Sequence, residues 1–165
     1  MNKITRIAAI LLIVVINIGC DQISKSVVRE NIEYHESIQL VSDNVILTKV
    51  ENSGAFLSIG ESLDPMMKNL LLLALPVLSI LFGLGWVFSQ SGNLDKSVLI
   101  AWCSIMGGGI GNIFDRLMYG SVTDFLFVQC GVFRTGIFNF ADVSITAGVV
   151  FIVGWQVFKN KKGDV

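Results

Sequence analysis

The chain has 165 residues, of which 53% are hydrophobic and only 15% are charged. This composition is too apolar for an ordinary water-soluble domain of this length and is typical of a protein that crosses a membrane several times. The formal net charge of −1 and the lack of a basic stripe with interleaved aromatic residues argue against a nucleic-acid partner.

Four apolar segments follow one another along the chain, at about residues 4–28, 69–88, 98–114 and 138–158. Each is close to the roughly 20 residues that a helix needs to cross about 30 Å of hydrocarbon. We therefore predict one membrane domain over residues 1–165, an α-helical polytopic protein with four transmembrane helices.

Between the first two segments the pattern changes. Residues 38–58 are rich in β-branched side chains and partly alternate, and residues 119–132 have a similar character, which favours short strands. We expect a small extracytoplasmic β-rich cradle, with its loop at about residues 38–65. Cytoplasmic flanks carry an excess of Lys and Arg. Both termini are therefore predicted to be cytoplasmic, because basic residues flank the first and last segments: Lys3, Arg6, Lys159, Lys161 and Lys162.

Histidine and cysteine usage limits the possible chemistry. The one histidine, His35, lies in a polar stretch, so an HExxH zinc site is excluded and a His-based triad is disfavoured. Cys20 and Cys103 lie in or beside apolar runs and are interpreted as small packing residues, whereas Cys130 falls in a predicted loop. We expect no metal and no cofactor.

The N-terminal residues also resemble a lipoprotein signal, because a basic start and an apolar run lead to Cys20. Asn17 fits that signal poorly, and three further apolar segments would make a lipid anchor redundant. An uncleaved first helix is the preferred interpretation.

Asp124 and Asp142 lie near the ends of apolar segments, where an unpaired carboxylate is costly. Two such acids suggest a shared proton and an activated water molecule. The structural alternative is that each acid only pairs with Arg116 or Lys25 and holds helices together. Spacing by itself does not decide between these hypotheses.

Several polar residues recur at helical spacing. Asp21 and Lys25 share one helix face, whereas Ser24 points about 100° away from Lys25, so a Ser–Lys dyad has poor geometry. Gly107 and Gly111 form a GxxxG pattern, which permits close approach of another helix. Two further pairs lie on common faces: Asn112 with Arg116, and Asn139 with Asp142.

Taken together and in order, the segments DQISK, NSGAF, GGGIGNIFDR, VTDF and FNFAD resemble the lipoprotein signal peptidase (signal peptidase II) family of bacterial intramembrane aspartyl proteases. The resemblance covers essentially the whole chain. It implies that Asp124 and Asp142 are the catalytic pair. It also implies that other polar positions line or support the site: Asp21, Lys25, Asn52, Gly54, Asn112, Arg116 and Asn139.

Three positions depart from the pattern of this family. Phe56 stands where a second alanine is common, Phe127 where some members have another acid, and Val143 where a Ser or Thr is frequent. These departures concern the shape of the pocket and leave the catalytic assignment intact.

The resemblance implies an aspartic endopeptidase that removes the signal peptide from diacylglyceryl-modified bacterial prolipoproteins. Its partners would be those substrates and membrane lipids, and we expect a monomer. The expected location is the bacterial cytoplasmic (inner) membrane, with the active site near the outer face. The alternative is a small four-helix membrane transporter that uses a buried Asp/Arg pair, Asp142 and Arg116, although the chain shows no internal repeat.

Overall fold

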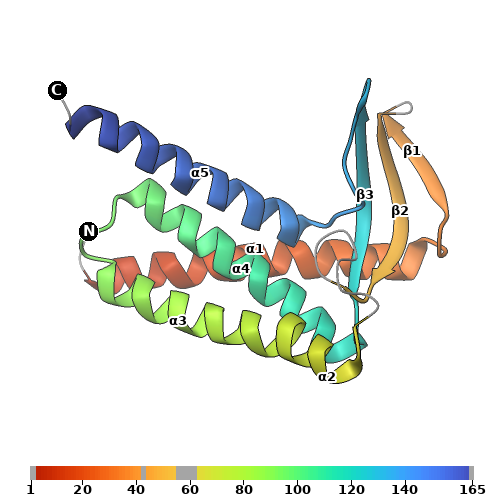
Figure 1. The fold of residues 1–165 in the computed structure, drawn as a ribbon, viewed down its shortest axis with the longest axis horizontal. Helices are drawn as coiled ribbons and strands as arrows, with labels where there is room; N and C mark the ends of the chain where they lie inside the picture. Colours follow the sequence, from red (N-terminus) through yellow and green to blue (C-terminus); the bar gives the residue numbers. More distant parts are fainter. Residues whose placement is uncertain (1–2, 42–43, 55–62, 164–165) are drawn as a thin grey trace.

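The computed structural model describes residues 3–41, 44–54 and 63–163. Figure 1 shows a bundle of helices with a small sheet across one end. The elements in chain order are α1 (Lys3–Asn31), β1 (Ser37–Val41), β2 (Val45–Asn52), α2 (Pro65–Lys68), the π-helical turn η2 (Asn69–Ala74), α3 (Leu75–Gln90), α4 (Lys96–Tyr119), β3 (Val122–Cys130), β4 (Phe133–Arg134) and α5 (Phe140–Gly163).

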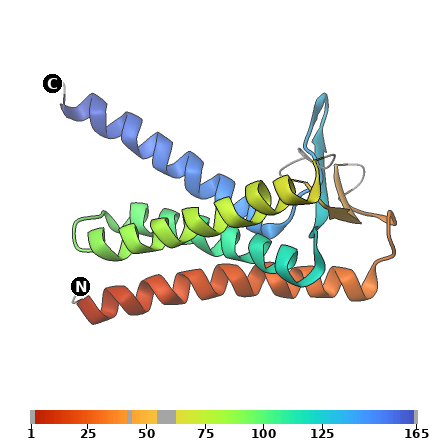
Figure 2. The ribbon, with the colours of Figure 1, turned by 60° about the horizontal axis from the view of Figure 1, so that its bottom comes forward.

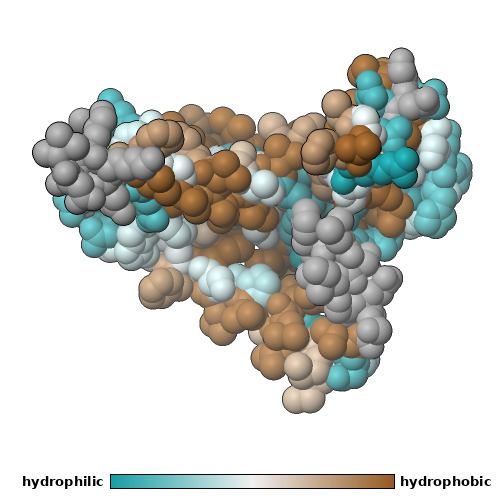
Figure 3. Space-filling view, turned by 45° about the horizontal axis from the view of Figure 1, so that its top comes forward, coloured by the Kyte–Doolittle hydropathy of each residue, from teal (hydrophilic) through white to brown (hydrophobic). Residues whose placement is uncertain are grey.

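Within the described part of the chain, four helical stretches are long and apolar enough to cross a membrane: Ile4–Asn31, Pro65–Gln90, Lys96–Tyr119 and Phe140–Lys159. Hydrophobic residues cover the helices in the middle of the molecule, and hydrophilic residues gather toward its two ends (Figure 3). Exposed apolar side chains on this scale require lipid around them. The predicted fold class, four membrane helices with a small β-rich part, is confirmed.

The strands form one antiparallel sheet in the order β1-β2-β3-β4. In the pairing of β2 with β3, Val50 lies opposite Asp124. Val28 of α1 and Ile32, the residue directly after this helix, pack with Phe125 of β3, and this contact fixes the sheet to the end of the helix. The predicted strands are therefore present, but Tyr119 is helical, and residues 55–58 lie outside the described part of the chain.

The start of α1 and the end of α5 lie at the same end of the bundle, opposite the sheet (Figures 1 and 2). In Figure 2, α1, α3 and α4 run alongside one another, whereas α5 diverges from them toward its C-terminal end. The first turns of α5, near the sheet, are therefore the part of this helix closest to the other elements.

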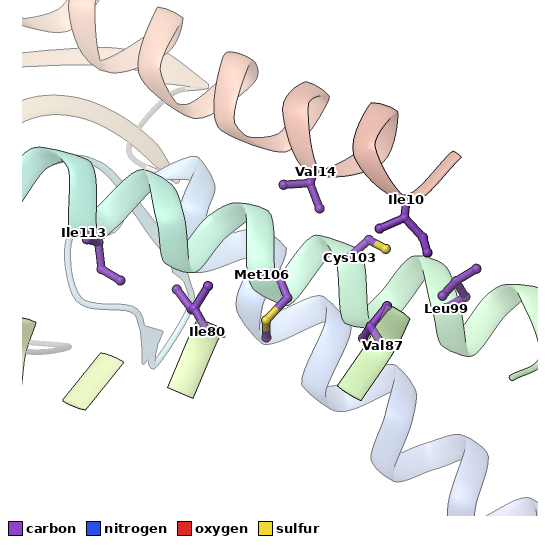
Figure 4. Close-up of a cluster of buried hydrophobic side chains, with 8 residues drawn as sticks. All are labelled: Ile10, Val14, Ile80, Val87, Leu99, Cys103, Met106 and Ile113. Atoms are coloured by element: carbon purple, nitrogen blue, oxygen red, sulfur yellow. The ribbon is translucent and has the colours of Figure 1, made fainter. Parts of the chain in front are cut away.

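The hydrophobic core joins α1, α3 and α4, with α4 in the middle (Figure 4). Its buried residues are Ile10, Val14, Ile80, Val87, Leu99, Cys103, Met106 and Ile113. A Cβ atom at Gly107 would lie 2.6 Å from the Cβ of Asn17, so α1 approaches α4 too closely for any side chain at that position. The close approach predicted from the GxxxG pattern is confirmed.

The cysteines differ in their surroundings. Cys103 is buried in the core, as predicted, but Cys20 is exposed on α1, so its interpretation as a packing residue is wrong. A helix surrounded by lipid has no need to bury an apolar side chain in protein, and the sequence pattern alone does not distinguish the two environments. Cys130 is exposed, but it lies at the end of β3 and not in a loop.

Candidate active site

A cavity of about 420 Å³ lies between the helices at the sheet end of the bundle, and both Asp124 and Asp142 line it. Asn52, Asn112 and Arg116 supply its other strongly polar side chains. The remaining lining is mostly apolar and comes from η2, α3, β3, the segment before α5, and α5: Leu71, Leu72, Pro76, Val122, Ile137, Ile145 and Thr146. The two acids predicted from the sequence therefore share one cavity.

Asp124 lies on strand β3, and two side-chain amides from other parts of the chain hold it in place. Its Oδ2 accepts a hydrogen bond from Asn52 Nδ2 at 2.9 Å, and its Oδ1 accepts one from Asn139 Nδ2 at 2.6 Å. The residue is only 4% exposed. Burial raises the pKa of Asp124 to about 6; the hydrogen bond from Asn52 opposes this rise, and the charge of Asp142 adds to it. A carboxyl group in this state exchanges its proton near neutral pH.

Asp142 lies in the first turn of α5, and the sequence of this turn explains its position. Asn139 precedes the helix and accepts a hydrogen bond from the Asp142 N–H at 3.0 Å, while Asp142 Oδ2 accepts from the Asn139 N–H at 3.2 Å. This reciprocal arrangement is a capping box, here built with Asn and Asp. Asp142 Oδ1 accepts a further bond from Asn112 Nδ2 at 2.9 Å, which links α5 to α4.

Main-chain pairing brings the two acids together. Phe138 donates to the Leu126 carbonyl, and its own carbonyl accepts from Phe125 and Leu126 at 3.0 and 2.8 Å. The residue before Asn139 is therefore fixed to the strand that carries Asp124. As a result, Asn139 bonds both acids, one through its side-chain amide and the other through its cap.

The turn after β2 connects Asn52 to α4. Asn52 Oδ1 accepts from the Gly54 N–H at 2.9 Å, and the Gly54 carbonyl accepts from Arg116 Nη2 at 2.9 Å. The buried Arg116 Nε has no hydrogen-bond partner among the described residues. This donor belongs to a side chain that lines the cavity.

Asp21 and Lys25 lie behind the cavity and are fully buried. Lys25 Nζ contacts Asp21 Oδ2 at 2.8 Å, Asn112 Oδ1 at 2.9 Å and Asp115 Oδ2 at 3.1 Å. Asp21 Oδ1 accepts the Ala141 N–H in the first turn of α5. The predicted pairing of Asp21 with Lys25 is confirmed, and it fixes the orientation of the Asn112 amide that faces Asp142.

All the predicted site residues thus belong to one continuous network of hydrogen bonds. The structural alternative for the two acids is wrong in its partners. Among the described residues, Asp124 and Asp142 accept hydrogen bonds from side-chain amides and a backbone N–H group, and neither forms an ion pair with Lys25 or Arg116. Asp115 on α4 forms ion pairs with Lys25 and Arg29 of α1.

Sequence analysis missed several supporting residues. Gln22 Nε2 donates to the carboxylates of both Asp21 and Asp115, and the Thr123 N–H donates to Asp115 Oδ2. Arg29 Nε donates to Thr123 Oγ1 at 2.8 Å. For Arg29 the sequence did hold a signal: Asp21, Lys25 and Arg29 recur every four residues, which places all three on one helix face.

Ser24 Oγ donates to the Asp21 carbonyl and does not contact the amine of Lys25, so the poor geometry expected for a Ser–Lys dyad is confirmed. Val143 is exposed on α5, and Phe127 pairs with Ile46 across β2 and β3. Phe56 lies outside the described residues.

Comparison with known proteins decides the family. The family model described as "Signal peptidase (SPase) II" matches residues 12–158. The chain belongs to the signal peptidase II family. As a member, it is a peptidase, and the comparisons give no support to the transporter alternative.

Relatives are similar in sequence to this signal peptidase II family member along nearly its whole length. A lipoprotein signal peptidase from Borrelia hermsii is 32% identical over 97% of this chain and 96% of its own. One from Desulforapulum autotrophicum is 30% identical over 93% of this chain and 94% of its own. A solved structure described as a bacterial membrane enzyme has a TM-score of 0.83 at 25% identity, over 94% of this chain and 92% of that one.

Proposed function

We propose that this signal peptidase II family member is an aspartic endopeptidase that removes the signal peptide from diacylglyceryl-modified prolipoproteins. The observation that carries this proposal is the joint position of Asp124 and Asp142, which line one cavity and are linked by Asn139. Relatives named lipoprotein signal peptidase along nearly the full chain support the substrate class.

Two carboxyl groups that share one proton suffice for peptide hydrolysis. The ionised member takes a proton from a water molecule, which attacks the scissile carbonyl, while the protonated member donates to the carbonyl oxygen. The roles then reverse as the amine leaves. The pair titrates as a unit, so neither acid is assigned permanently as general acid or base.

The amides and the guanidinium around the pair fit a peptide backbone. Arg116 lines the cavity, and its guanidinium is suited to a substrate carbonyl. Asn52, Asn112 and Asn139 hold the acids and limit where the substrate main chain can lie. An extended peptide needs such groups because its own N–H and C=O groups lose water inside the membrane.

We also propose a location in the bacterial inner membrane, as a monomer with one membrane domain over residues 1–165. Both termini would be cytoplasmic and the cavity would face the outer side. The basic residues at both ends support this, as does the placement of the cavity at the sheet end, away from the start of α1 and the end of α5. Reporter fusions after Val165 should report cytoplasm, and fusions near Asn44 the outer side; an outward signal at Val165 would overturn this orientation.

The substrate proposal is tested with purified protein in nanodiscs. A prolipoprotein whose cysteine carries a diacylglyceryl group should be cut before that cysteine, and the same precursor without the lipid should be cut at least 100-fold more slowly. The reaction should continue in a strong chelator, because two acids need no metal. Equal cleavage of both precursors would contradict the substrate class, and activity lost to chelator and restored by added metal would contradict the aspartic mechanism.

A further inference from the structure

A second groove of about 410 Å³ runs along α5 beside the catalytic cavity. One wall is the segment at residues 135–138 and the other is one face of α5, made by Asp142, Val143, Thr146, Ala147 and Val150. Positions 142, 146 and 150 recur every four residues, so they form a stripe about 12 Å long down the helix.

The two grooves meet at the catalytic pair. Ile137, Asp142 and Thr146 line both the cavity that holds the two acids and the groove on α5. A molecule with two branches at one atom can therefore place one branch in each groove while the branching point stays beside Asp142. A lipid-modified cysteine is such a branching point, because its backbone continues as peptide and its sulfur carries the glyceryl lipid.

The chemistry of the two grooves differs. The catalytic cavity contains amides and a guanidinium, which satisfy a peptide main chain. Apart from Asp142 at its end, the α5 groove offers only the hydroxyls of Thr135 and Thr146 as polar side-chain groups. A peptide would leave its N–H and C=O groups unpaired there, at a high cost in free energy, whereas a hydrocarbon chain has none to satisfy.

The groove is also open to the surrounding lipid. Val150 is 65% exposed, and Val143 is exposed as well. The side chain of Val143 adds an apolar group to the wall of the groove. An acyl chain can enter sideways from the membrane without leaving a hydrocarbon environment.

We propose that the α5 groove binds an acyl chain of the substrate's own diacylglyceryl group and so positions the modified cysteine at the catalytic pair. This inference rests on the proposed function. In a membrane the gain comes from packing and orientation, because lipid and groove are equally apolar. Its expected effect is therefore on the rate at which a correctly lipidated substrate is cut.

The direct test is photo-crosslinking to the Asp124→Asn variant with a diacylglyceryl-prolipoprotein that carries a diazirine midway along one acyl chain. The label should fall on residues 143–150, and excess unlabelled substrate should remove it. The control is phosphatidylethanolamine with the same diazirine chain, which labels the protein wherever ordinary membrane lipid touches it. Its label on the outer faces of α1 and α3 should remain when unlabelled substrate is added. Competed label at Leu71 or Leu72 instead would overturn the inference. Cleavage of unlabelled substrate by the wild type would show that the proposed function still stood.

A matched pair of variants tests the same idea by rate. Ala147→Phe fills the groove, whereas Val149→Phe adds similar bulk at an exposed position that does not line it. Ala147→Phe should lower kcat/KM at least tenfold for a dipalmitoylglyceryl substrate and less than twofold for a diacetylglyceryl substrate. Val149→Phe should change both less than twofold. Equal losses on the two substrates, or the same loss from Val149→Phe, would contradict the inference.

Discussion

The hydrogen bond from Asn52 to Asp124 should set the pH at which activity changes. Asn52 Nδ2 donates to Asp124 Oδ2 at 2.9 Å in a buried position, and this bond stabilises the ionised carboxylate. Its loss in Asn52→Ala must raise the pKa of Asp124 further above its present value of about 6. A hydrogen bond to a charged group contributes about 1.5–3 kcal/mol, and one pKa unit corresponds to about 1.4 kcal/mol. The expected shift is therefore roughly one to two units.

The assay is kcat/KM against pH for wild type and Asn52→Ala on one diacylated substrate. The limb of the pH–rate profile that reports the ionisation of Asp124 should move to higher pH. This holds whether Asp124 works as base or as acid, because its pKa rises in both cases. The absolute rate should also fall, since Asn52 Oδ1 accepts from Gly54 N–H. Asn31→Ala, which removes an exposed side-chain bond to the Val27 carbonyl, should leave the limb unchanged. An Asn52→Ala limb that stays in place or moves to lower pH would refute this reasoning.

Two further substitutions test the buried network that supports the site. Gly111→Ala would place its Cβ against the carboxylate of Asp21, so it should destabilise the fold by about 1–3 kcal/mol. Gly85→Ala should be neutral, because among the described residues no atom beyond its chain neighbours and its own helix backbone lies within 4 Å of the added Cβ. Thermal unfolding in detergent compares the two variants. Lys25→Met leaves the buried carboxylates of Asp21 and Asp115 without the cation that they share, so it should lower the free energy of unfolding by about 3–5 kcal/mol. Lys96→Met, at an exposed position, should leave stability unchanged. Membrane yield and melting temperature are measured for both variants, and equal values would contradict the role of Lys25.

Patterns along one helix predicted the local parts of the site well. The four-residue spacing of Asp21 and Lys25 predicted their contact correctly. The three-residue spacing of Asn139 and Asp142 predicted a common helix face, but Asn139 lies just before α5, and the two residues meet in the cap of that helix. The contact of Asp21 with Lys25 depends on helix geometry alone. The membrane helices followed from the length of apolar segments for the same reason.

Relations between elements were not visible in the sequence. Asp115 bonds Lys25 and Arg29 because α1 packs against α4 at Gly107 and Gly111, and nothing local to Asp115 indicates a partner on another helix. The exposure of Cys20 had the same cause, because the faces of α1 toward lipid and toward protein are both apolar. The groove on α5 also required three dimensions, since its two walls are a helix and the segment before it.

Hydrolysis by Asp124 and Asp142 is the central claim, and parallel assay of their amide variants tests it most directly. Asp124→Asn and Asp142→Asn keep the side-chain shape but cannot ionise, and Asp95→Asn makes the same change at an exposed position in the turn at the opposite end of the bundle. Each protein is reconstituted at equal amount with the same diacylglyceryl-prolipoprotein, and initial cleavage is measured. The first two variants should lose at least 1,000-fold in rate while accumulating normally in the membrane, and Asp95→Asn should match the wild type. Cleavage within tenfold of wild type by either Asp124→Asn or Asp142→Asn would contradict the account.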